Sequence, residues 1–212
     1  MDKNELVIIG DVIKSRRKFQ ASEWENFHNS IESINNNFLQ SLTIPITIYS
    51  GDSFGAICRD MISAVEIILA IQEYQQHHRS RIVLIEDHIS FGIDQKNFLT
   101  LEGPALWKSK NKLTFLKKNK MSFIADLKNE LMTISINTIT NLIISIRNDW
   151  GEIEWAIYKK YNSNTRQKDI AKELGISQQY VSKIVNKSRI KLVKSSENNL
   201  KSIIYGIYNY NH

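Results

Sequence analysis

Near the C-terminus, one segment constrains the fold more than any other part of the chain: QKDIAKELGISQQYVSKIVNK, residues 167–187. Ala171 is followed four residues later by Gly175, and then by Ile176 and Val181. A small residue lets two helices cross closely, a glycine turns the chain, and the later apolar residues pack the second helix. The spacing therefore predicts two short helices joined by a tight turn, the arrangement called a helix-turn-helix.

The second of these helices would expose a polar face. A serine before its first turn is a good N-cap. Gln can pair with adenine in the major groove, Ser can contact a base or a phosphate, and Lys and Arg neutralise phosphates. The first turns of such a helix meet the base edges. The residues predicted to contact DNA are Ser177, Gln178, Gln179, Ser182, Lys183, Lys187 and Arg189.

Charge is unevenly distributed along the 212 residues, whose formal net charge is +6. Residues 1–150 contain 17 basic and 17 acidic side chains, whereas residues 151–212 contain 11 and 5. Such an asymmetry suggests a neutral domain followed by a module that meets a polyanion. A lysine-rich solvated surface is the alternative interpretation of the charge alone.

Composition narrows the class of protein. Hydrophobic residues make up 42% and charged residues 24%, as in ordinary globular domains. The single Cys58 cannot form an internal disulfide, and no apolar run reaches the ~18 residues of a membrane span. The acidic N-terminal segment does not resemble a signal peptide. We therefore expect a cytoplasmic protein with no membrane partner. The sequence also has no zinc-ligand spacing and no P-loop motif.

Strand and helix patterns alternate through the first 148 residues, in an order that predicts an α+β fold with one mixed sheet packed against helices. The long connection after the first strand allows a parallel pairing. The domain boundary is placed at 148/149, giving domains 1–148 and 149–212, the second all-α. In chain order we expect strand 5–9, helix 24–38, hairpin 44–57, helix 59–77, a β-rich stretch 82–101 bending at Gly92, a helix from Gly103, strand 121–125 and helix 127–147.

Two acids follow glycines at expected chain reversals. Asp11 ends the first strand and Asp52 lies at the tip of the hairpin. Two convergent carboxylates suit Mg²⁺, which keeps several waters and takes further ligands from phosphate. Lys14 and Arg16 would neutralise those phosphates, and Gly51 would let a ligand approach the backbone. Taken singly, each Gly-Asp pair is also ordinary turn chemistry.

Four landmarks follow one another along the chain: GDVIKSRR, GDSFGA, FGI, and EGPALW with KSKNKL. With these landmarks the sequence resembles the SatD family of bacterial proteins over nearly the whole chain. More remotely they resemble class III nucleotide cyclases, and the tail resembles LuxR and sigma-factor region four modules. The cyclase resemblance implies a ferredoxin-like palm fold, a nucleoside triphosphate ligand, and metal ions at Asp11 and Asp52. The remaining positions expected at the nucleotide are Lys14, Arg16, Gly51, Ser53, Gly103 and Lys110.

Departures from the cyclase pattern count against enzymatic turnover of a nucleotide more than against nucleotide binding. Ile48 stands where cyclases have a base-reading Lys, and Trp107 stands where they have an Asn. Lys110 lies one residue short of their Arg and cannot reproduce its bidentate fork. We therefore predict a DNA-binding regulator with a nucleotide ligand and Mg²⁺, forming a homodimer. The alternatives are a divergent nucleotidyl cyclase tethered to DNA, and a degenerate palm that only dimerises.

Overall fold

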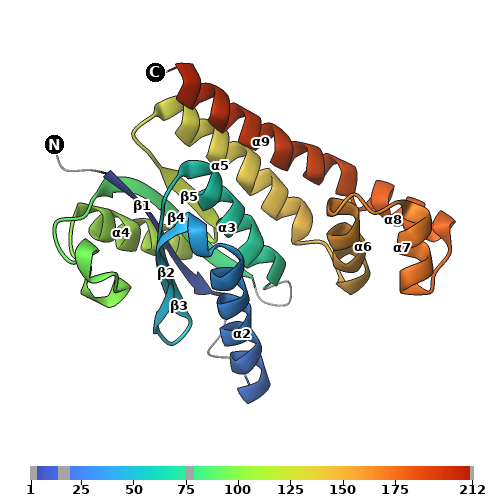
Figure 1. Cartoon of the computed structure of the whole chain (residues 1–212), viewed down its shortest axis with the longest axis horizontal. Helices are drawn as coiled ribbons and strands as arrows, with labels where there is room; N and C mark the ends of the chain where they lie inside the picture. The colour runs from blue at the N-terminus through green and yellow to red at the C-terminus, as the bar shows by residue number, and fades with distance from the viewer. Residues whose placement is uncertain (1–3, 14–19, 75–78, 211–212) are drawn as a thin grey trace. The chain divides into compact units, whose positions relative to one another are not determined.

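The computed structural model describes residues 4–13, 20–74 and 79–210 (Figure 1). The chain separates into two compact units, Met1–Asn137 and Thr138–His212. The division falls inside helix α5 (Glu130–Arg147), whereas the sequence-based boundary at 148 lies just after that helix ends. Helix α5 therefore contributes residues to both units.

A five-stranded mixed sheet forms the centre of the N-terminal unit, in the order β2-β3-β1-β4-β5. The α+β class and the mixed sheet are confirmed. The parallel pair is β4 with β5, joined through α4, whereas β1 is antiparallel to both of its neighbours. The parallel pairing that the long connection after the first strand allows is therefore not formed by β1. The strands span Asn4–Val12 (β1), Leu42–Ser50 (β2), Ser53–Cys58 (β3), Ser80–His88 (β4) and Phe123–Asp126 (β5).

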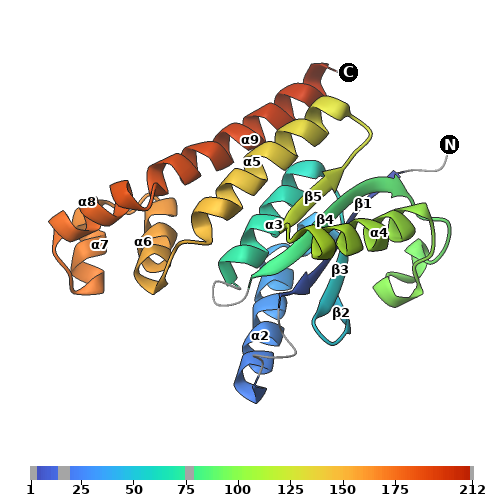
Figure 2. The ribbon, with the colours of Figure 1, turned by 180° about the vertical axis from the view of Figure 1, so that it is seen from behind.

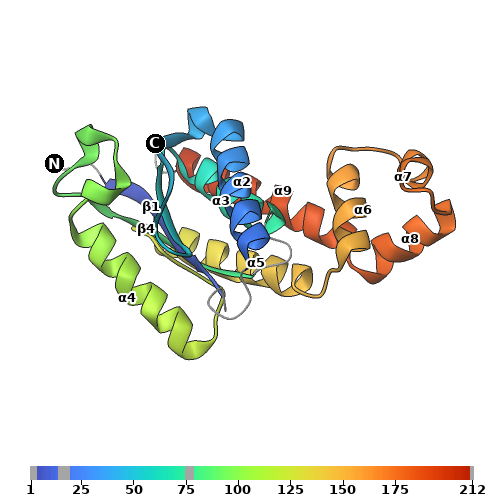
Figure 3. The same cartoon turned by 90° about the horizontal axis from the view of Figure 1, so that it is seen from below.

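Helices cover both faces of this sheet. Helices α2 (Ala21–Asn37) and α3 (Met61–Tyr74) lie on one face and α4 (Pro104–Asn119) on the other (Figure 3). Because side chains alternate along a strand, one set faces α4 and the next faces α2 and α3. The core on the α4 side consists largely of Val7, Ile9, Ile44, Ile57, Val83, Ile85, Leu106, Leu113 and Leu116.

Two predictions for this unit are wrong. Strand β1 does not stop at a Gly-Asp turn but continues to Val12, because Gly10 gives room to its neighbours. A Cβ there would lie 2.3 Å from the Phe54 ring and 2.7 Å from the Arg81 carbonyl oxygen. The stretch 82–101, expected to be β-rich on both sides of a bend at Gly92, is a strand only as far as His88.

After His88 the chain forms two short 3-10 turns, η2 (Ile93–Gln95) and η3 (Phe98–Thr100). Its one isolated bridge among the described residues joins Phe91 to Glu102. Gly92 has φ +92°, and a Cβ there would lie 2.3 Å from the Thr100 carbonyl oxygen. This glycine therefore tightens the turn instead of marking the bend of a strand pair.

Each outer strand of the sheet receives the side-chain amide of an asparagine. Asn35 of α2 accepts from the Ile46 N–H at 2.8 Å and donates to the Ile46 carbonyl at 2.9 Å on β2. Asn137 of α5 does the same for Ala125 on β5, with both bonds at 2.8 Å. Pro45, also in β2, has no N–H to satisfy. At these positions the amide plays the part of a neighbouring strand.

The C-terminal unit is all helical (Figure 2). Besides the end of α5 it contains α6 (Glu152–Asn162), α7 (Gln167–Leu174), α8 (Gln178–Lys187) and α9 (Ile190–Tyr210). The two short helices predicted around Gly175 are α7 and α8. Gly175 ends α7 with φ +65°, and the buried Ala171, Val181, Ile184 and Val185 form the contact side of the pair.

A buried charged cluster holds this unit together. Arg147 at the end of α5 donates to the Tyr158 hydroxyl and to the Glu197 carboxylate. The Tyr158 hydroxyl lies 2.8 Å from Glu197 Oε2. The guanidinium also lies over the rings of Trp150 and Trp155, at 6.0 and 5.4 Å from their centres. Three helices, α5, α6 and α9, are joined by this group.

Candidate functional site

Asp11 lies inside β1 on the face that α4 covers, and only 3% of its surface is exposed. Its Oδ1 is 3.2 Å from Arg81 Nη1 on β4, the residue directly across the strand pair. Its Oδ2 is 2.6 Å from Lys117 Nζ near the end of α4. Both carboxylate oxygens therefore meet a cation supplied by the chain.

The hairpin tip lies beside Asp11. Ser53 pairs directly with Asp11 across β1 and β3, and the Val12 N–H donates to the Asp52 carbonyl at 3.3 Å. Gly51 has φ +57°, and a Cβ there would meet nothing within 4 Å. This glycine therefore serves the turn, and no close neighbour forces its small size.

Tyr49 shows that the two acids share one environment. Burial, together with the smaller effects of the Asp11 and Asp52 charges, raises the pKa of the Tyr49 phenol to about 12. Its ring stacks on Phe98 at 5.6 Å between centres. The hydroxyl therefore stays protonated at neutral pH.

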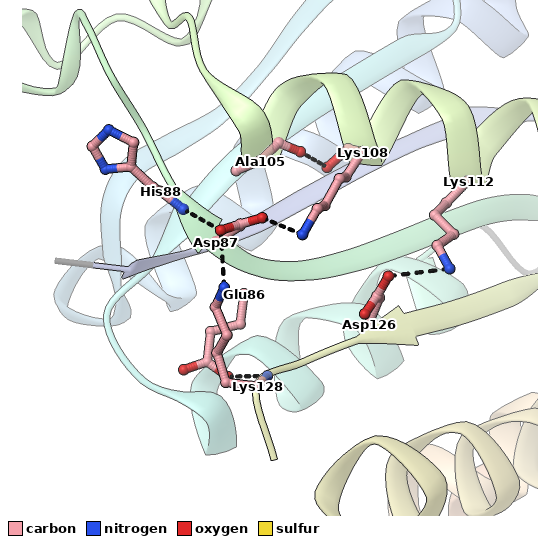
Figure 4. Close-up of polar contacts among 9 residues, drawn as sticks. Glu86, Asp87, His88, Ala105, Lys108, Lys112, Asp126 and Lys128 are labelled. Carbon is pink, nitrogen blue, oxygen red and sulfur yellow. Dashed lines mark hydrogen bonds and ion pairs between the residues drawn. The ribbon is translucent and has the colours of Figure 1, made fainter. Parts of the chain in front are cut away.

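Helix α4 meets an acid on three different strands. Besides Lys117 with Asp11, the Nζ of Lys108 is 2.5 Å from Asp87 on β4, and that of Lys112 is 3.1 Å from Asp126 on β5. Figure 4 shows Lys108 and Lys112 reaching from successive turns of α4 to these two acids. The helix is thus fixed to the sheet by a row of lysines as well as by its leucines.

The carboxyl group of Asp87 has a strongly perturbed pKa. Burial alone would raise its pKa, but hydrogen bonds from Lys108, the His88 N–H and Lys128 lower it well below the usual range. Lys128 Nζ lies 3.0 Å from Asp87 Oδ1. The hydrogen bond between Lys108 and Asp87 raises the pKa of Lys108 in turn. This group is an anchor whose charge is fully compensated.

In the C-terminal unit, α8 begins as the sequence predicts. The Ser177 hydroxyl accepts from the Tyr180 N–H at 3.1 Å, which identifies it as the N-cap. Gln178, Gln179 and Lys183 are exposed, and Ser182 is half-buried. Each of these side chains is carried by α8, whose opposite side is buried.

Basic residues continue beyond this helix. Lys187 and Arg189 are exposed and also border a pocket of about 240 Å³ with Asp149, Trp150 and Glu154. Trp150 Nε1 donates to the Ser188 carbonyl at 2.9 Å, which fixes the end of α8. Arg189 has φ +56° in the turn between α8 and α9.

Comparison with known proteins gives the family. The model described as the SatD family matches residues 5–204. The chain belongs to the SatD family. A search of curated proteins returned no match for this SatD-family chain. Among the described residues, none of its helices has both the length and the apolarity that crossing a bilayer requires.

Solved structures show a distant likeness for the SatD fold. The adenylyl cyclase CyaB from P. aeruginosa is 12% identical, with a TM-score of 0.41 over 54% of this chain and 73% of that one. A bacterial light-regulated adenylyl cyclase is 16% identical, with a TM-score of 0.44 over 59% of this chain and 76% of that one. A regulator of polyketide synthase expression from Bifidobacterium adolescentis is 11% identical, with a TM-score of 0.28 over 94% of this chain and 86% of that one. No activity is transferred from likenesses this distant.

The nucleotide positions expected from the sequence are only partly brought together. Asp11, Gly51, Asp52 and Ser53 meet at one end of the SatD sheet. Gly103 lies at the other end: a Cβ on it would be 3.1 Å from the His88 carbonyl oxygen, and His88 pairs with Asn4. Lys110 is exposed on α4. Lys14 and Arg16 lie outside the described residues.

The residues near Asp11 do not fit the Mg²⁺ site that the cyclase resemblance implies. A magnesium ion would need carboxylate oxygens that Arg81 and Lys117 already occupy. Across the described residues, no group of three or more His, Cys, Asp and Glu side chains could hold a metal ion. This SatD site is built around cations of its own.

Sequence analysis did not identify Tyr49, Arg81 or Lys117 as members of this site. Arg81 could have been found from the strand pairing, because opposite charges commonly face one another across neighbouring strands. Lys112 follows Lys108 by four residues and therefore lies near it on α4, but Lys117 comes five residues after Lys112, so the helical repeat alone does not group it with the other two. Which acids they meet depends on the strand order, which the local pattern does not contain.

Proposed function

We propose that this protein is a cytoplasmic DNA-binding regulator in which α7 and α8 form a helix-turn-helix and α8 enters the major groove. The observation that carries the proposal is the two-sided character of α8. Val181, Ile184 and Val185 are buried on one side, whereas Gln178, Gln179 and Lys183 are exposed. A recognition helix needs both a packed back and a polar front.

Charge supports the same proposal. Between Glu173 and Glu197 the chain has five basic side chains and no acidic one. Lys194 is used within the unit, because its Nζ lies 3.0 Å from the Tyr161 carbonyl and 2.6 Å from Asn164 Oδ1. The other four are exposed: Lys183, Lys187, Arg189 and Lys191. These four would neutralise backbone phosphates, which gives affinity and a salt dependence but little sequence preference.

The experiment compares the glutamines with a lysine. A preferred duplex is first selected with the full chain from a random library, and binding is then titrated on that duplex and on a scrambled one. Gln178→Ala and Gln179→Ala should each cost ~1–3 kcal/mol on the preferred duplex and little on the scrambled one. Lys187→Ala should weaken both alike.

Asn199→Ala, an exposed amide on α9, is the matched control and should change neither titration. The proposal fails if the full chain shows no salt-sensitive binding to any duplex. Recognition by α8 fails if both glutamine variants bind the two duplexes as the parent does.

For the N-terminal unit we propose a phosphate-bearing ligand, such as a nucleotide, at the end of the sheet where Asp11 lies. Arg81 and the half-exposed side chain of Lys117 support it, since they place two cations beside the exposed turn at Gly51. The alternative of a nucleotidyl cyclase is less favoured. Trp107 is 57% exposed where a cyclase would present its Asn.

Self-association through α9 is the third part of the proposal. Ile203 and Tyr205 are exposed on this helix, with 63% of the tyrosine accessible. Helix-turn-helix proteins commonly bind as dimers to two half-sites one helical turn apart. The oligomeric state by sedimentation, with and without the selected duplex, tests this part.

A further inference from the structure

The surroundings of Asp11 contain a feature that a metal-binding carboxylate would not have. Of its side chain 5% is exposed, and each oxygen has a separate cation, Arg81 on one and Lys117 on the other. Arg81 comes from the neighbouring strand and Lys117 from the helix that covers the face. The carboxylate is therefore compensated from two directions before any ligand arrives.

The pair with Lys117 is one of a series. Lys108 and Lys112 of the same helix make corresponding pairs with acids on β4 and β5. Three pairs with the same polarity, lysine on the helix and aspartate on the strand, indicate that Asp11 helps to fix α4 on the sheet. In this respect it resembles Asp87 and Asp126, which lie elsewhere on the sheet.

We infer that Arg81 and Lys117 act as built-in counter-cations at Asp11, in place of a divalent metal, and that a phosphate-bearing ligand at this end of the sheet binds without one. A magnesium ion at Asp11 would have to displace an ammonium or guanidinium group and would be repelled by whichever remained. The ligand part of this inference rests on the proposed function. The metal part does not.

The other polar groups nearby agree with this arrangement. Burial and the charges of Asp11 and Asp52 raise the pKa of Tyr49, so its hydroxyl is neutral at pH 7 and adds no charge beside Asp11. Asp52 faces the same region and is half-buried. Once the charge of Asp11 is compensated, Asp52 is a single carboxylate, and one carboxylate with no phosphate ligand is a weak site for Mg²⁺.

The first experiment asks whether the full chain binds a divalent metal at all. Mn²⁺ titrations followed by electron paramagnetic resonance count bound ions in the parent protein, in Asp11→Asn and in Lys117→Met. The inference predicts no ion in the parent and in Asp11→Asn. An ion bound by the parent would overturn it, and loss of that ion in Asp11→Asn would locate it at Asp11. The measurement on the parent decides the question even if a variant fails to fold.

A second measurement tests the structural role of the pair. Asp11→Asn and Lys117→Met should each lower the thermal unfolding midpoint, and the double variant should lose less than the two losses combined, because the pair is shared. Lys110→Met, exposed on the same helix, is the control and should leave the midpoint unchanged. Additive losses in the double variant would argue against direct pairing of Asp11 with Lys117.

ATP serves as the probe for the ligand part, titrated by calorimetry in EDTA and again with Mg²⁺. The inference predicts equal affinity in both and a clear loss in Lys117→Met. Binding that requires Mg²⁺ would contradict the metal-free mode. No binding under either condition would remove ATP as the ligand, whereas the Mn²⁺ result would still decide the metal part.

Discussion

Helices α4 and α8 both carry lysines, and they use them in opposite ways. Three lysines of α4 are paired with acids on β1, β4 and β5. In α8, no described residue forms an ion pair with Lys183 or Lys187, and the nearest acids in sequence are Glu173 and Glu197. The charge of α4 is used inside the fold, and that of α8 is left for a partner.

This difference shows why net charge alone is a weak guide to function. The N-terminal part is neutral because its acids and bases balance, and the structure shows several of them in contact. The C-terminal excess is informative because it coincides with a helix whose other side is buried. A basic residue favours nucleic-acid binding when its charge is not used in an ion pair within the fold.

The largest effect should come from the one strongly buried charge pair described in the C-terminal unit. Glu197→Ala leaves Arg147 buried without its carboxylate, which should cost about 3–5 kcal/mol in the free energy of unfolding. Trp150 and Trp155 lie beside Arg147 and report the loss by fluorescence during denaturant unfolding. An exposed pair should differ, since removing Glu173 from Lys160 costs about 0–1 kcal/mol.

If Glu197→Ala unfolds outright, the double variant Arg147→Met with Glu197→Leu tests the same point. Replacing both members of a buried pair by apolar side chains leaves no uncompensated charge, so it should be markedly more stable than the single variant. Equal stability of the single and double variants would show that the pair, as a charge pair, contributes little.

An intermediate effect is expected at Asp87, whose pKa is lowered by Lys108, Lys128 and the His88 N–H. Asp87→Asn should cost about 1–3 kcal/mol at neutral pH. The pKa of Asp87 in the folded protein lies below the ordinary value of about 3.9. At pH values between these two pKa values the unfolded chain therefore binds more protons than the folded one. The stabilisation is therefore present above about pH 4 and is lost as the pH falls toward the folded pKa.

Acid titration of the unfolding free energy measures this dependence. In Asp87→Asn the acid limb should become shallower than in the parent. Asp94→Asn, at an exposed acid in η2, provides the comparison and should keep the parent's slope. A parental acid limb in Asp87→Asn would mean that other carboxylates govern the pH dependence.

The smallest effect on stability should occur at Lys183. Lys183→Ala should change the free energy of unfolding by less than about 0.5 kcal/mol, because the side chain is exposed. It should nevertheless reduce the slope of log affinity against log salt by about one, since one fewer counterion is released from DNA. Lys108→Met should show the converse, with lower stability and an unchanged slope. Similar behaviour of the two variants would end the contrast between α4 and α8.

Most elements could be predicted from the sequence where a local pattern determines the structure. Phe27, Ile31 and Ile34 at helical spacing are the buried face of α2, and the SGDS turn joins β2 to β3. Gly175 and Ser177 were found because a left-handed residue and a helix N-cap are local requirements.

The remaining features depend on contacts between distant segments. The sequence pattern places Asp11 at a turn, but its environment is set by residues 70 and 106 positions away, Arg81 and Lys117. The extension of β1 through Gly10 likewise depends on where Phe54 lies. For the same reason Arg147, Tyr158 and Glu197 give no signal as a cluster, because α5, α6 and α9 bring them together only in the folded unit.

The asparagines at the two outer strands affect how this protein behaves at high concentration. An open strand edge invites another copy to add a strand, and edge-to-edge growth of that kind leads to aggregates. Asn35 and Asn137 occupy backbone groups at Ile46 and Ala125 that an incoming strand would need. Copies of this chain should therefore remain dispersed when crowded, and any specific assembly should use its helices.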